Sequence, residues 1–171
     1  MEAGADAWPQ HAALEYVDMS RTDTASLVID APQDRVYRAL IDPEALVKWV
    51  PPGNMTGSIE HLDAWPGGSY RMVLTNPEGS GSWGKSTENS DIVVAKFIEL
   101  IPGQRVTYAV SFEIKDPGHV IPMVMSWDLI PVDGGIRVRV TAENVPEMVS
   151  EQDHAAGLAS SLEKLALYLN D

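Results

Sequence analysis

The C-terminal segment constrains the fold more than any other part of this sequence. Four leucines recur at intervals of four, three and four residues, which keeps them on one side of a helix: Leu158, Leu162, Leu165 and Leu169. Ser150 is a favourable cap for the start of that helix, with Asp153 three residues further on. Ala155, Ala159 and Ala166 lie beside the leucine stripe and would let a sheet approach closely. We therefore predict one long amphipathic helix over residues 150–170, which most of the preceding strands must wrap around.

Upstream of the helix, apolar and polar residues alternate in short runs that turn residues separate. This pattern predicts strands over residues 22–29, 56–64, 69–75, 91–100, 105–114, 120–130 and 136–141. Two short helices are predicted after the first strand. One begins at Pro32, which suits the first helical position, and the other is capped by Asp42 before Pro43.

Short turns between consecutive strands imply antiparallel pairing, and a sheet with one apolar face has to bury that face. The leucine stripe is the obvious partner for it. The predicted fold class is therefore α+β, with an antiparallel sheet of about six to seven strands around the C-terminal helix. Residues 1–20 lack clear periodicity and are predicted to be a loosely ordered extension, followed by a single domain over residues 21–171.

Charge and composition narrow the classes of partner. The chain has 12 Lys and Arg against 25 Asp and Glu, a formal net charge of −13. Nucleic acids and anionic membranes require a cationic surface, so we expect neither as a partner. The absence of cysteine excludes disulfides and thiolate chemistry. The sequence shows neither a secretory signal nor an apolar run that approaches the roughly 18 residues of a membrane span, so we expect a cytoplasmic protein.

Several short motifs, in this order of elements, resemble those of one superfamily. They are residues 31–40 with Asp42-Pro43-Glu44, Trp49-Val50-Pro51-Pro52, residues 63–72 with Pro66-Gly67-Gly68, Pro102-Gly103, Glu143-Asn144-Val145-Pro146, residues 153–157 and Ser161-Leu162. Over residues 22–170 the chain resembles the helix-grip superfamily, also called SRPBCC or START-like. The branch it is most similar to is named after the activator of heat-shock protein 90 ATPase homologue. Trp65 departs from the pattern, because an arginine commonly precedes the Pro-Gly-Gly turn.

The resemblance implies a curved antiparallel sheet that grips the C-terminal helix, with a cavity between them that holds lipids, hormones or polyketides in other members. Methionine adapts to irregular shapes, and Tyr or Trp place a polar tip in an apolar wall. Side chains of these types alternate inward along the strands here, which suits a small apolar or aromatic ligand. The alternative is an ordinary filled core. The predicted lining is Trp49, Met55, Tyr70, Met72, Tyr108, Met123, Met125, Trp127, Leu158 and Leu162.

Residues able to carry other chemistry are few. The histidines are His11, His61, His119 and His154, and none has the spacing of a metal site, so we expect no metal and no cofactor. Alternation places His61 and Asp63 on one strand face and Glu60 on the other. The position of His154, in the first turn of the predicted helix, is explained by helix capping. Arg71 is expected to point away from Tyr70, in an ion pair on the outer face. No catalytic residue is predicted.

Three functions follow from these observations. The first is sequestration, transport or sensing of an apolar or aromatic molecule beneath the C-terminal helix. The second is a co-chaperone-like interaction module, which the branch name alone suggests and which an exposed apolar surface near residues 49–55 would favour. The third is an enzyme of the cyclase or aromatase type, which requires a titratable group with a perturbed pKa in the cavity. The free edges of an open sheet also leave a homodimer as an alternative.

Overall fold

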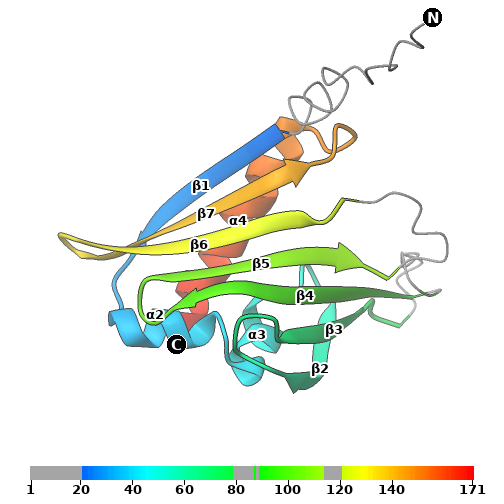
Figure 1. The fold of residues 1–171 in the computed structure, drawn as a ribbon, viewed down its shortest axis with the longest axis horizontal. Coiled ribbons are helices and arrows are strands. Elements are labelled where there is room, and N and C mark those ends of the chain that lie inside the picture. The colour runs from blue at the N-terminus through cyan, green and yellow to red at the C-terminus, as the bar shows by residue number, and fades with distance from the viewer. Residues whose placement is uncertain (1–20, 79–86, 88, 114–120) are drawn as a thin grey trace, which may run out of the picture.

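A twisted antiparallel sheet forms the body of the molecule (Figure 1). The computed structural model describes residues 21–78, 87, 89–113 and 121–171. Seven strands pair there in the order β1-β7-β6-β5-β4-β3-β2. Their bounds are β1 Arg21–Ile29, β2 Thr56–Leu62, β3 Ser69–Thr75, β4 Ser90–Ile101, β5 Arg105–Phe112, β6 Met123–Val132 and β7 Gly135–Val145. The predicted fold class is confirmed, although β7 runs beyond residue 141, where the sequence pattern had ended it.

The predicted helices form as α2 Gln33–Ala39, α3 Pro43–Trp49 and α4 Glu151–Leu169. Asp42 caps α3 by accepting the Glu44 N–H at 2.9 Å, and Ser150 caps α4 by accepting the Asp153 N–H at 3.0 Å. Pro32 is the N-cap of α2 rather than its first helical residue, because its extended ψ of 140° lies outside the helical region.

Helix α4 lies behind the sheet in Figure 1 and runs from the β1 side towards α2. It contacts β1, α2 and α3. Its four predicted leucines are buried as expected. The expected close approach at Ala155 and Ala159 is wrong, since both are exposed and only Ala166 is half-buried. The helix packs mainly through the leucine stripe, and the flank that carries these two alanines faces solvent.

The strand register gives the sheet an inner, apolar face and an outer, charged face. Inner-face residues lie opposite one another across neighbouring strands, as with Val106 and Trp127 on β5 and β6. The outer face carries ion pairs, including Arg71 with Glu113 at 2.8 Å, so the expectation for Arg71 is confirmed. No helix of the described residues has the length and apolar character needed to cross a membrane.

Some expectations fall on residues outside the described ranges. These are the predicted extension over residues 1–20 and two of the histidines, His11 and His119. The structure therefore bears on the domain body and on the other two histidines.

Candidate functional site

The inner face of the sheet holds a group of apolar side chains that the fold buries only in part. We call it the inner-face patch and define it as Tyr70, Val93, Tyr108, Val110, Met123 and Met125, on strands β3 to β6. Tyr108 lies opposite Met125, and Val110 lies opposite Met123, in the antiparallel register of β5 and β6. Because side chains two residues apart share a face, these residues all point to the helix side of the sheet.

Burial changes along this face. Val106 and Trp127, further along β5 and β6, are buried at 0% and 3% exposure. Every member of the inner-face patch except Tyr70 is half-buried instead. Helix α4 packs mainly on β1, at one end of the strand order, so part of the inner face on β4 to β6 lacks full cover. Half-buried apolar area of this kind gains stability when a ligand covers it.

Aromatic rings form the deep side of the patch. The Tyr70 ring lies 5.9 Å from that of Phe97 and 6.5 Å from that of Tyr108, centroid to centroid, with the rings steeply inclined to each other. The Trp127 indole N–H donates to the Tyr108 hydroxyl at 2.9 Å. Edge-to-face rings and a buried indole hydrogen bond fix the side chains that a ligand would meet.

The two tyrosine hydroxyls are neutral hydrogen-bond donors. Burial raises the pKa of Tyr108 to about 12, against the opposing effect of the Trp127 N–H bond. Burial raises the pKa of Tyr70 well above the ordinary value of 10.0, and the nearby Tyr108 adds to the rise. Desolvation disfavours the charged phenolate, so both side chains keep their proton at physiological pH.

The ten predicted lining residues divide into two groups. Six are packed at 5% exposure or less, and four are half-buried. The packed ones are Trp49, Tyr70, Met72, Trp127, Leu158 and Leu162, and the half-buried ones are Met55, Tyr108, Met123 and Met125. The lining role of the ten stays a prediction, because the side chains themselves do not show what they bind.

Two of the predicted residues lie away from the patch. Trp49, predicted as a lining residue, is a core residue whose indole N–H donates to the Ala39 carbonyl at 2.8 Å and whose ring packs on Trp127. Met55 lines a separate groove of about 680 Å³ between α3 and the C-terminal end of α4, with Lys48, Lys164 and Leu167. Met55 thus borders a hollow other than the inner-face patch.

Val93 belongs to the patch and was missed from the sequence. It stands in the run Ile92-Val93-Val94, where every position is apolar, so alternation cannot tell which side chain points inward. The register resolves this, because Val93 lies opposite the inner-facing Met72 of β3. Val110 was placed on the correct face by alternation but was not among the predicted lining residues.

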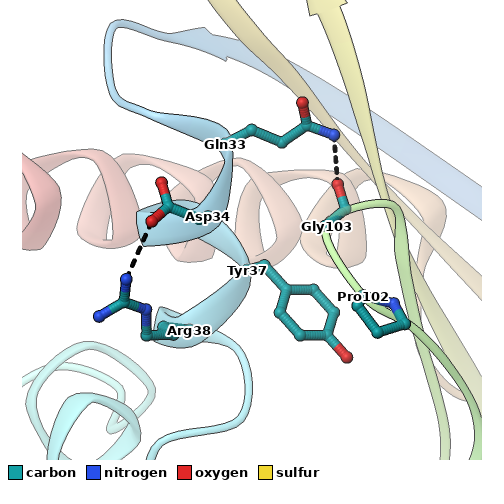
Figure 2. A pocket seen from close by; sticks show the side chains of 6 residues that line it. All are labelled: Gln33, Asp34, Tyr37, Arg38, Pro102 and Gly103. Atoms are coloured by element: carbon teal, nitrogen blue, oxygen red, sulfur yellow. Dashed lines mark hydrogen bonds and ion pairs between the residues drawn. The ribbon is translucent and has the colours of Figure 1, made fainter.

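A second hollow lies between α2 and the β4–β5 turn (Figure 2). Its volume is about 540 Å³ and it is open to solvent. Gln33 donates to the Gly103 carbonyl, and Arg38 pairs with Asp34 at 2.9 Å while both side chains are more than 70% exposed. Figure 2 shows the Tyr37 ring extending towards Pro102. These polar groups are largely solvated or already paired, so this hollow is a weaker candidate than the inner-face patch.

Two histidines are described, and each bonds to an aspartate. His61 lies on the same face as Asp63 as predicted, with Nε2 2.6 Å from Oδ2, on the surface. Capping does not account for His154, whose Nδ1 lies 2.6 Å from Oδ2 of Asp23 while Arg21 binds the same carboxylate. Asp23 was missed, although alternation from Ala25 places it on the inner face. Among the described residues no group of three or more His, Asp or Glu could hold a metal.

The fold is similar to that of several solved structures. A protein from Chromobacterium violaceum shares 28% identity, covers 88% of this chain and 99% of its own, and superposes with a TM-score of 0.73. Proteins from Rhodobacter sphaeroides and Mycobacterium smegmatis, 17% and 18% identical, both give TM-scores of 0.69. They cover 87% of this chain, and 91% and 90% of their own lengths. These likenesses show the helix-grip fold.

The comparison with families gives a more specific result. No curated protein matches the chain. The model of the family described as Activator of Hsp90 ATPase homolog 1-like protein matches residues 30–170, which cover nearly the whole described domain. The chain therefore belongs to the family of Activator of Hsp90 ATPase homolog 1-like proteins.

Proposed function

We propose that this protein binds a small apolar or aromatic molecule on the inner-face patch, between the sheet and α4. The observation that carries the proposal is the half-burial of four neighbouring apolar side chains, Val93, Val110, Met123 and Met125, beside two deeply set tyrosines. Covering such side chains contributes about 25 cal/mol for each Å² of apolar area removed from water. Binding of hydrophobic ligands is common among proteins of this fold, which supports the same function here.

A fluorescent probe tests the proposal. N-phenyl-1-naphthylamine is neutral and apolar, and its emission rises when it leaves water. We expect saturable binding to the native protein, and Met123→Gln to weaken it at least about threefold, because a buried CH₂ contributes roughly 0.8 kcal/mol. Val124→Gln is the matched control, since Val124 is also half-buried but points to the outer face of the same strand. Absence of saturable binding, or equal weakening by both variants, would contradict the proposal.

The enzyme hypothesis keeps one supporting observation. The cyclase or aromatase type needs a titratable group with a perturbed pKa, and Tyr70 and Tyr108 are such groups. Their raised pKa values keep them protonated at physiological pH, so they cannot accept a proton as bases but can donate hydrogen bonds to an oxygen that gains negative charge during a reaction. Turnover of a carbonyl compound by the native protein, lost in Tyr70→Phe, would move the proposal from binding to catalysis.

The co-chaperone hypothesis has less support. An exposed apolar surface near residues 49–55 would favour it, but Trp49, the largest side chain there, is only 3% exposed. The family's name refers to an activator of a chaperone ATPase, and this remains the reason to consider the hypothesis. A cytoplasmic location stays a prediction from the sequence.

A further inference from the structure

The Tyr70 hydroxyl has no protein partner in the described part of the chain. Tyr70 is 5% exposed, and its pKa is governed by burial and by Tyr108 without any hydrogen bond. Yet every fully enclosed side-chain nitrogen or oxygen of the described residues has a hydrogen-bond partner. The Tyr70 oxygen is therefore not fully enclosed and keeps some solvent-accessible area. A small molecule that reaches the inner-face patch can contact it.

Tyr108 adds a second donor beside it. The Trp127 indole N–H can only donate, so the Tyr108 oxygen accepts that bond and keeps its own hydrogen free for another acceptor. No described side chain takes that hydrogen. The two rings are close enough for Tyr108 to affect the pKa of Tyr70. Two hydroxyls that lack an acceptor among the described residues are thus carried by rings whose centroids lie 6.5 Å apart on an apolar wall.

The inner-facing side chains around the two tyrosines carry no charge. The inner-facing positions of β3 to β6 around the tyrosines are all aliphatic, aromatic or methionine: Met72, Val93, Ala95, Phe97, Val106, Val110, Met123, Met125 and Trp127. An anion bound here would lose its hydration without gaining a cationic partner, and the net charge of −13 adds to that penalty. A cation would find few acceptors, since the Tyr108 oxygen already accepts from the Trp127 N–H and no carboxylate stands among these inner-facing positions. The favoured polar group is a neutral acceptor oxygen.

We infer that the ligand is a neutral aromatic molecule with a ketone or quinone oxygen, which accepts hydrogen bonds from Tyr70 and Tyr108 together. The inference rests on the proposed function and adds the chemical class of the ligand. The rings of Tyr70, Phe97 and Tyr108 present their edges and faces to a flat aromatic body, and the methionine sulfurs of β6 adapt to its outline. The carbonyl oxygen of such a ligand would accept from two donors for which the described residues offer no acceptor.

Three probes of one shape test this inference by calorimetry. Fluorenone and fluorene differ by the carbonyl oxygen, and fluorene-9-carboxylate carries a negative charge. We expect the native protein to bind fluorenone about 10-fold more tightly than fluorene, because two net hydrogen bonds are worth about that factor, and to bind the carboxylate most weakly. The infrared carbonyl stretch of fluorenone is expected to move to lower frequency on binding.

Tyr70→Phe removes the hydroxyl and keeps the ring. It is expected to reduce the preference for fluorenone to about threefold and to reduce the infrared shift, because one of the two hydrogen bonds is lost, while fluorene binds as before. Tyr37→Phe is the matched control, because Tyr37 is a half-buried tyrosine on α2 outside the patch, and it is expected to change neither. Melting temperatures check that both variants fold.

The outcomes separate the inference from the proposed function. Equal binding of fluorenone and fluorene, or an unchanged preference in Tyr70→Phe, would overturn the inference and leave the binding function standing. Tighter binding of the carboxylate would also overturn it. If neither neutral probe binds, the inference and the proposed function fail together.

Discussion

Asp23 is the residue that ties the first strand to the last helix. Its Oδ2 accepts from Arg21 Nη2 at 2.9 Å and lies 2.6 Å from Nδ1 of His154, in the first turn of α4. The Arg21 guanidinium lowers the pKa of Asp23 below its ordinary value of 3.8, burial opposes that effect, and His154 adds to the lowering. A carboxylate held in this way stabilises the contact between β1 and α4 only while it is charged.

Asp23→Asn is expected to destabilise the protein by roughly 1–3 kcal/mol at pH 7, because it removes charge-assisted hydrogen bonds. A lowered pKa contributes stability above the unfolded value and loses it as the pH falls through the folded value. The difference between native protein and variant should therefore shrink as the pH drops below about 4. Urea unfolding at pH 7 and pH 3 measures this difference in the free energy of unfolding. Asp30→Asn is the control, because the Asp30 side chain is exposed. A difference that stays constant with pH would refute this role.

At the scale of elements, α4 shows what periodicity can and cannot predict. The spacing of its leucines fixed which side is buried, because any partner would have to cover that stripe. The spacing could not show which elements the helix contacts, namely β1, α2 and α3, so Ala155 and Ala159 were assigned to a contact that does not form. The same limit hid the bond from His154 to Asp23, since the two residues are 131 positions apart.

Two leucines of α4 allow a matched test of this packing. Leu165 is 0% exposed and Leu167 is 71% exposed. Leu165→Ala is expected to lower the free energy of unfolding by about 2–5 kcal/mol, because it removes buried methyl groups and leaves a cavity. Leu167→Ala is expected to change it by less than about 0.5 kcal/mol. Chemical denaturation measures the free energy of unfolding of both variants. A similar decrease in Leu165→Ala and Leu167→Ala would mean that α4 packs through a different side.

For the whole molecule, turn spacing was enough to predict an antiparallel sheet, because short connections leave little choice of pairing. The pairing of β1 with β7 had no such local signal, since the two strands are far apart in sequence. At the site, alternation pointed Tyr108 and Trp127 inward, but their hydrogen bond depends on the register of β5 against β6. The incomplete cover of the inner-face patch depends on where α4 lies, which no strand pattern encodes.

The central claim is that an apolar molecule binds on the inner-face patch, and methionine methyl NMR tests it most directly. Met123 and Met125 belong to the patch, whereas Met148 is 92% exposed and serves as an internal control. With ¹³C-methyl methionine, assigned by single Met→Leu variants, addition of N-phenyl-1-naphthylamine is expected to shift the Met123 and Met125 signals and leave Met148 in place. Unmoved Met123 and Met125 signals at saturating probe, or shifts confined to Met55 or Met148, would contradict the claim.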